Sequence, residues 1–110
     1  MAKYLVQASY SKEGVKGILN EGGSKRREAM VKAVEALGGS VEAVYFAFGD
    51  VDAFIILDLP DNVAATAASL VVNATGTVNA TYTVLITPEE VDQAVEKAGK
   101  VFGEYRAPGQ

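Results

Sequence analysis

The stretch from Ser40 to Leu59 reads SVEAVYFAFGDVDAFIILDL, and it decides the fold. Two runs rich in β-branched and aromatic residues flank the polar turn Gly49–Asp52, which is the pattern of a β-hairpin. Successive side chains of a strand point to opposite faces of the sheet, and both faces of this hairpin carry large apolar side chains. We therefore predict strands over residues 40–48 and 53–59, in a sheet that needs cover on both faces.

Alternating apolar and polar residues predict one more strand at each end of the chain, over residues 3–10 and 78–86. Between the first strand and the hairpin we expect one or two loose helical turns after Ser11. A break at Asn20–Gly23 should follow, and then the main helix, capped by Ser24. Apolar residues at helical spacing predict the buried stripe of this main helix: Met30, Ala33, Val34 and Leu37.

Two more helices have clear starting residues. Asp61 is the expected N-cap of a helix over residues 63–74. Thr87 and Glu90 form a capping box, with proline between them, for a helix that runs to about Phe102. The expected buried faces are Val63, Ala67, Leu70, Val71 and Ala74 in the first helix, and Val91, Ala94, Val95 and Ala98 in the second.

This order of elements predicts a single α+β domain over residues 1–110, with the ferredoxin-like βαββαβ arrangement and an additional C-terminal helix. Both crossover helices should lie on one face of a four-stranded antiparallel sheet, which leaves an apolar face bare. The mean hydropathy is +0.14 and 49% of the residues are hydrophobic, more than a small core can hide. We therefore expect a homo-oligomer in which another subunit covers that face. A charge at Ile55 or Ile56, whichever points away from the helices, should break the assembly or prevent folding.

The composition excludes several kinds of chemistry. The chain has no Cys and no His, so cysteine or histidine nucleophiles and thiolate or imidazole zinc sites are ruled out, and we expect no metal and no cofactor. A net charge of −4 argues against nucleic acid as a partner. No apolar run is long enough to span a membrane and the first residues do not resemble a signal peptide. We expect no membrane partner and a cytoplasmic location.

Five stretches together resemble the GYD domain family and cover nearly the whole chain. They are KYLVQASY at residues 3–10, GVKG at 14–17, GGSKRR at 22–27, FGDVD at 48–52 and TPEEV at 87–91. The resemblance departs at the tripeptide that names the family, because Val51 stands where an aromatic residue is expected.

The resemblance implies membership of the dimeric α/β-barrel superfamily, in which two ferredoxin-like subunits pack sheet to sheet. The family itself has no established activity. Other branches of the superfamily include cofactor-free monooxygenases, isomerases and haem enzymes, which is an analogy of fold alone.

The segment Gly22–Arg27 is the first candidate site. Three cations lie in the expected first turn of the main helix, where the helix dipole favours negative charge. This conflict predicts a bound anion, such as a phosphate or carboxylate; the alternative is a solvated helix start whose cations pair with nearby glutamates. The expected contacts are Gly22, Gly23, Ser24, Lys25, Arg26 and Arg27.

A second candidate site is a pocket lined by phenols and amides. Tyrosines on the strands could orient an aromatic ligand or stabilise an enolate, and asparagines could add polar anchors. The alternative is a packed core whose hydroxyl groups reach its rim. The residues are Tyr4, Tyr10, Tyr45, Tyr82, Asn73 and Asn79. Asp50 and Asp52 could hold a cation, but aspartate is also common in hairpin turns.

The sequence therefore supports two functions. One is an oligomeric domain that binds a small ligand or has a regulatory role, without catalysis of its own. The other is a cofactor-free enzyme that acts on a small aromatic or anionic metabolite in a tyrosine-lined pocket. The lack of His and Cys favours the first, and the tyrosines favour the second.

Overall fold

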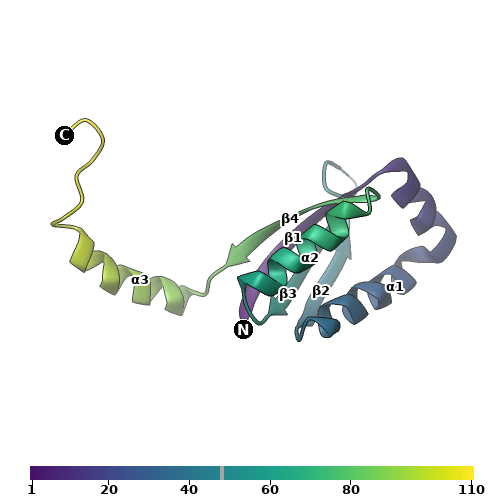
Figure 1. Cartoon of the computed structure of the whole chain (residues 1–110), viewed down its shortest axis with the longest axis horizontal. Coiled ribbons are helices and arrows are strands. Elements are labelled where there is room, and N and C mark those ends of the chain that lie inside the picture. Colours follow the sequence, from purple (N-terminus) through teal and green to yellow (C-terminus); the bar gives the residue numbers. More distant parts are fainter. Residues whose placement is uncertain (48) are drawn as a thin grey trace.

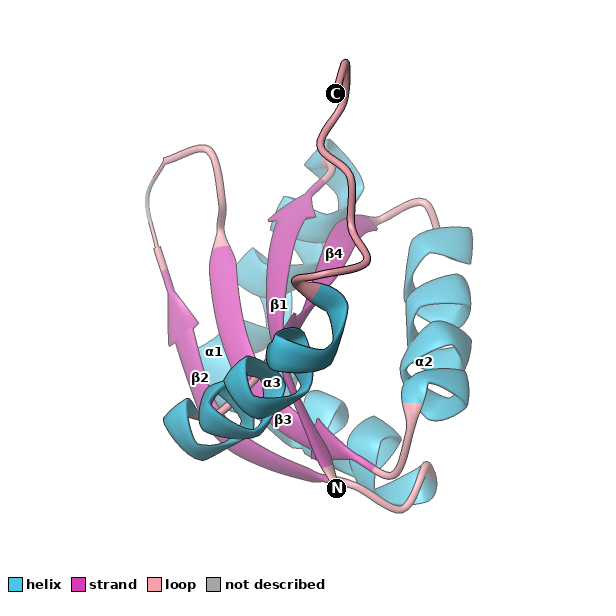
Figure 2. Ribbon diagram, turned by 90° about the vertical axis from the view of Figure 1, so that its left-hand side faces the viewer, coloured by secondary structure: helices cyan, strands magenta, loops and turns pink. Residues whose placement is uncertain are grey.

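A four-stranded antiparallel sheet forms the body of the protein in this computed structural model, which describes residues 1–47 and 49–110 (Figure 1). The strands, in the order β2-β3-β1-β4 across the sheet, are β1 (Ala2–Tyr10), β2 (Ser40–Phe46), β3 (Ala53–Leu59) and β4 (Val78–Leu85). The helices are α1 (Lys12–Ala36), α2 (Asn62–Ala74) and α3 (Pro88–Val101). The predicted ferredoxin-like arrangement is confirmed, with α1 and α2 on one face of the sheet (Figure 2).

The core lies between the sheet and these two helices. Tyr4 pairs with Leu57 and Val6 with Ile55, so the even residues of β1 and the odd residues of β3 face the helices. In β2 a bulge between Val41 and Ala43 shifts the register. The predicted strand over residues 40–48 ends at Phe46, and Phe48 lies outside the described residues.

Helix α1 is one element with a kink, and it differs from the prediction in two ways. Ser11 caps it, because its hydroxyl accepts a hydrogen bond from the amide of Gly14 at 3.2 Å. This start after Ser11 is as expected, but the segment before the kink, residues 12–21, is longer than the one or two turns predicted. The expected break occurs at Gly22, whose φ of 82° and ψ of 173° are non-helical. Glycine adopts this left-handed φ without a steric penalty. The chain re-enters the helix at Gly23, so Ser24 lies inside it and is not its N-cap.

Helix α2 begins as predicted but presents a different face to the sheet. The Asp61 carboxylate accepts a hydrogen bond from the amide of Ala64 at 2.9 Å, as an N-cap should. Ala65 is buried, whereas the larger Val63, Leu70 and Val71 are exposed. The prediction followed the largest apolar residues, but a face of alanines lets the helix approach the sheet more closely.

Helix α3 begins with the predicted capping box and then leaves the body. The Thr87 hydroxyl accepts from the amide of Glu90 at 3.1 Å, and the Glu90 carboxylate accepts from the amide of Thr87 at 3.0 Å. However, no residue of α3 is buried, so the expectation of a buried stripe is wrong for the single chain. Figure 1 shows α3 continuing outward from the end of β4. Across the described ranges, each helix is too short or too polar to cross a bilayer.

The sheet face opposite α1 and α2 is the open face. Leu5 pairs with Ile56 and Tyr45 with Phe54 on this side, and Tyr45 is 70% exposed. Lys3 also lies here, and its ammonium forms ion pairs with the carboxylates of Glu42 and Asp58. Hydrogen bonds from Lys3, to Glu42 first and then to Asp58, raise its pKa.

Candidate functional site

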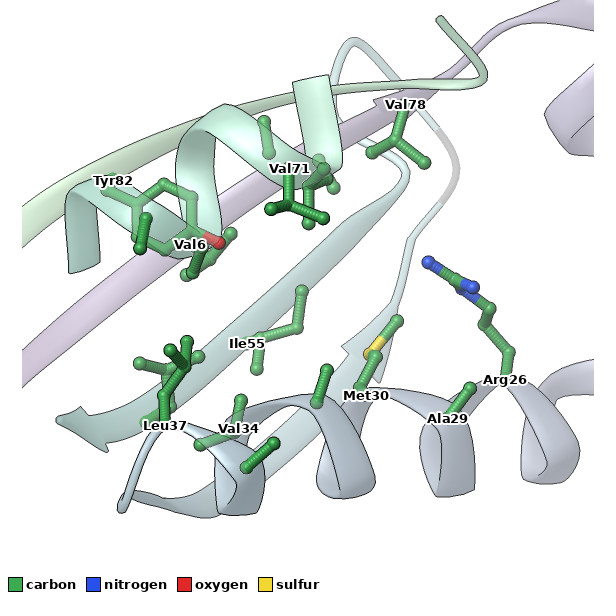
Figure 3. Close-up of a pocket in the computed structure, with 18 of the residues that line it drawn as sticks. Val6, Arg26, Ala29, Met30, Val34, Leu37, Ile55, Val71, Val78 and Tyr82 are labelled. Carbon is green, nitrogen blue, oxygen red and sulfur yellow. The ribbon is translucent and has the colours of Figure 1, made fainter. Parts of the chain in front are cut away.

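A cavity of about 380 Å³ lies between α1, α2 and the central strands (Figure 3). Its floor is apolar and comes from β1, β3 and β4, while its walls come from the facing sides of the two helices. The cavity is large enough for a small metabolite, since ligand sites in proteins commonly measure about 300–1,000 Å³.

The cavity exists because the helix walls carry small side chains. Ala29 and Ala33 of α1 face the cavity, as do Ala67 and Ala68 of α2. A methyl group cannot fill the gap between two helices that lie over different strands of one sheet. Around these alanines, larger apolar residues close the floor and the ends: Val6, Met30, Val34, Ile55, Leu57 and Val72.

Two residues that line this apolar cavity each have a buried polar atom without a hydrogen-bond partner in the described part of the chain. Tyr10, the last residue of β1, and Arg26 of α1 both line it. The Tyr10 hydroxyl and the Arg26 Nε are buried, and neither has a hydrogen-bond partner in residues 1–47 and 49–110. An unsatisfied buried polar group costs about 1–3 kcal/mol, so a polar group of a ligand that reached either atom would remove that cost.

Arg26 gives the cavity a single charge. Figure 3 shows its side chain reaching over the end of the cavity near Val78, with Tyr82 at the other end. Among the described lining residues Arg26 alone is charged, so no protein carboxylate neutralises it there. Burial raises the pKa of Tyr82, which keeps its phenol neutral at physiological pH. The cavity therefore offers one permanent cation and the neutral phenol of Tyr82 on an apolar surface.

The segment Gly22–Arg27 does not converge on one point. Arg26 enters the cavity, but Ser24, Lys25 and Arg27 are exposed on the surface. A Cβ on Gly23 would lie 3.3 Å from the ring of Phe46, so this glycine lets an aromatic side chain approach the helix. Of the six predicted anion contacts, Arg26 alone is brought to the tyrosine pocket.

The tyrosines predicted to line one pocket are divided between two faces of the sheet. Tyr10 and Tyr82 line the cavity. Tyr4 is buried and its hydroxyl donates to the Asn62 side chain at 2.7 Å, which satisfies it within the fold. Tyr45 lies on the open face, so it cannot reach the cavity.

The predicted asparagines do not line the cavity either. The amide of Asn73 donates to the carbonyl of Ala80 at 3.1 Å and accepts from the Ala80 amide at 2.8 Å, which joins α2 to the edge strand β4. Asn79 is exposed, and with Asn73 it borders a separate hollow beside Tyr10.

The hairpin aspartates have structural contacts. The Asp52 carboxylate accepts from the backbone amide of Tyr10 at 2.8 Å, and the Asp50 carbonyl accepts from the Ser9 hydroxyl at 2.9 Å. These bonds tie the hairpin turn to the end of β1. In the described part of the chain no group of three acidic residues is placed to hold a metal ion.

Sequence reasoning did not connect Arg26 with the cavity, although a signal was present. Arg26 precedes Met30 by four residues and Ala33 by seven, so it continues the apolar stripe of the same helix. A cation in line with a stripe that faces the sheet is a sign of a charge directed inward. That Arg26 and Tyr10 line the same cavity depends on tertiary packing, which the sequence pattern does not show.

Comparison with known proteins identifies the family of this chain. The family model described as GYD domain matches residues 4–95, which is most of the chain. No curated protein and no solved structure matches this chain. The matched range includes β1, α1, the hairpin, α2, β4 and the beginning of α3. The chain belongs to the GYD domain family.

Proposed function

We propose that this protein is a homo-oligomeric binding domain. Each subunit binds a small molecule with an apolar body and one carboxylate in the cavity between α1 and α2. The observation that carries the proposal is that two residues lining a largely apolar cavity, Tyr10 and Arg26, each have a buried polar atom without a hydrogen-bond partner among the described residues.

The chemistry of the two groups favours a carboxylate. Guanidinium groups bind carboxylates through two parallel N–H···O bonds, and one of the available edges of the group includes Nε. The Arg26 Nε has no hydrogen-bond partner in the described part of the chain, so no described protein group occupies that hydrogen-bonding position. The Tyr10 hydroxyl supplies another donor to the same cavity, and the alanine walls accept an aromatic ring or a short alkyl chain.

Binding is favoured over catalysis by the lining residues. Arginine stays protonated, and the raised pKa of Tyr82 makes its phenol a poor base at neutral pH. The alternative, a cofactor-free enzyme, has its support in the same tyrosine, because a neutral buried phenol can donate a hydrogen bond to an enolate.

The assembly proposed for this domain uses the open face of the sheet. Leu5, Tyr45, Phe54 and Ile56 give this face large apolar side chains that a second subunit would cover. Ile56 is the residue that points away from the helices, because its neighbour Ile55 lies in the core. The substitution Ile56→Glu should therefore break the oligomer and leave the core intact.

Calorimetric titration with paired ligands tests the binding site. Benzoate and octanoate should bind and raise the melting temperature. Benzamide and octanamide, which are neutral, should bind at least ten times more weakly. Acetate, which lacks the apolar body, should also bind at least ten times more weakly. The change Arg26→Met keeps the apolar stem and removes the charge. It should weaken benzoate or octanoate binding by about 10- to 100-fold, since a charged hydrogen bond contributes about 1.5–3 kcal/mol.

The control is Arg27→Met, which removes the same charge from an exposed position one residue away. It should leave the affinity unchanged. Equal weakening by both changes, or equal binding of acids and amides, would show that the cavity is not a carboxylate site. Native mass spectrometry of the purified protein would report the assembly and any ligand that it carries.

A further inference from the structure

Helix α3 carries an apolar stripe that its own chain leaves uncovered. The α3 stripe consists of Val91, Ala94, Val95, Ala98 and Phe102. Val95 is 66% exposed and Phe102 is 87% exposed, although both lie on the apolar side of the helix. An amphipathic helix in water normally packs its apolar side against another surface.

The surface area of the chain indicates how large the missing cover is. The chain exposes 7839 Å², whereas a compact monomer of 11.5 kDa exposes about 5,800 Å². The radius of gyration is 17.7 Å, compared with about 13 Å for a compact domain of this length. The excess of about 2,000 Å² matches what one subunit of an obligate homodimer buries. A second copy of the chain is therefore an occupant of the right size.

We propose that α3 of each chain packs on a second copy, with the α3 stripe lying against Tyr45 and Phe54 of that copy. These two residues are cross-strand neighbours at one corner of the open face, here called the aromatic corner. The inference rests on the sheet-face pairing proposed above, and it adds a second contact that can fail independently.

The strand register shows why a chain does not cover its own aromatic corner. Leu85 at the end of β4 is level with Lys3, while Phe54 is level with Thr81. The corner therefore lies four residues back along the strands, about 13 Å, and three strands across, about 14 Å. Helix α3 starts from the diagonally opposite corner and points away from the sheet (Figure 1).

Two-fold symmetry can bring the two corners together. In a face-to-face pair, each sheet has two diagonals: one joins the start of α3 to the aromatic corner, and the other joins the remaining two corners. A two-fold axis that lies between the sheets along this second diagonal places the start of each α3 beside the partner's aromatic corner. The strands of the two sheets then cross at nearly 90°, which is one of the two ways in which sheets pack face to face. The open face and the α3 stripe thus become parts of one continuous interface.

Engineered cysteines test the contact directly, because the natural chain has none. A chain with Val95→Cys is co-expressed with a differently tagged chain carrying Tyr45→Cys, and mild oxidation should give a disulfide-linked heterodimer in high yield. Gln93→Cys is the matched control, since it lies in the same turn on the polar side of α3. It should give a background yield with Tyr45→Cys.

A third cysteine position distinguishes the aromatic corner from the exposed face of α2. Val95→Cys should cross-link poorly to Leu70→Cys, although Leu70 is also exposed, at 67%. A stronger link to Leu70→Cys, or equal yields for Val95→Cys and Gln93→Cys with Tyr45→Cys, would overturn the proposed contact.

Sedimentation of charge variants gives a second readout. Val95→Glu should raise the dimer dissociation constant by about tenfold or more, and Gln93→Glu, which adds the same charge to the same turn, should leave it unchanged. If Ile56→Glu dissociates the dimer and Val95→Glu does not, the proposed contact between the α3 stripe and the aromatic corner is wrong, while the sheet-face pairing stands. If neither change has an effect, both are wrong.

Discussion

The change Asn73→Ala should destabilise the protein through the joint between α2 and β4. The Asn73 amide makes two bonds across this joint, to the carbonyl and the amide of Ala80, at 3.1 and 2.8 Å. Because β4 is an edge strand, the outward amide and carbonyl of Ala80 have no neighbouring strand to pair with on that side. The Asn73 side chain takes the place of that strand.

The magnitude follows from two opposing effects. Two hydrogen bonds contribute about 1 kcal/mol each, which gives a loss of about 2 kcal/mol. Alanine is the better helix former and returns about 0.5 kcal/mol within α2. The net loss in the free energy of unfolding should be about 1.5 kcal/mol, or a fall of about 8 °C in the melting temperature.

Urea unfolding followed by circular dichroism, at one fixed protein concentration, measures this loss. Asn79→Ala is the control, because the Asn79 side chain is exposed and forms no hydrogen bond with the described part of the chain, and it should change the stability by less than about 0.5 kcal/mol. If both alanine variants lose the same stability, or if Asn73→Ala loses less than about 0.5 kcal/mol, the joint does not stabilise the fold as described.

Two further predictions concern α1 and the open face. Gly22→Ala should destabilise the fold by about 1 kcal/mol because of the left-handed φ of 82°. Gly17→Ala should stabilise the fold by about 0.5–1 kcal/mol, because Gly17 lies within the helix and a Cβ there would meet only open space. Thermal unfolding measures both variants, and a stabilising Gly22→Ala would refute the kink. The raised pKa of Lys3 means that its ion pairs stabilise the fold below the unfolded pKa near 10.5, and that this contribution disappears as the pH rises through the folded value. Lys3→Met should remove that alkaline loss, which urea unfolding between pH 8 and pH 11 would detect, whereas an unchanged pH profile would contradict it.

The strands could be predicted because their side chains alternate with a period of two. The capping box at Thr87 could be predicted because its two hydrogen bonds are local in the sequence. The face that α2 turns to the sheet could not be predicted. The residues that fit closest to the sheet are alanines, whereas Val63 and Leu70 are more hydrophobic and were expected to be buried. A separate helix start was wrongly placed at Ser24, because a serine after two glycines looks like a cap, whereas α1 continues past a kink at Gly22.

The candidate site was predictable only in pieces. Arg26 and Tyr10 were each identified from the sequence, in separate hypotheses, because one lies in a cationic helix segment and the other on a strand. Both line one cavity because α1 packs over the end of β1, and no local sequence pattern encodes that packing. The exposure of α3 was likewise hidden, since its amphipathic sequence indicates a partner but not which chain provides it.

The alanine walls of the cavity have a consequence for how ligand choice can change. Alanine has no side-chain rotamers, so these walls cannot move aside to admit a larger molecule or close around a smaller one. The width of the cavity is therefore a property of the backbone, set by where α1 and α2 sit over the sheet. One longer side chain at Ala29, Ala33, Ala67 or Ala68 would divide the space without disturbing the core or the charge at Arg26. Under the proposed function, size selectivity is thus separable from recognition of the acid group, and each can vary while the other is kept.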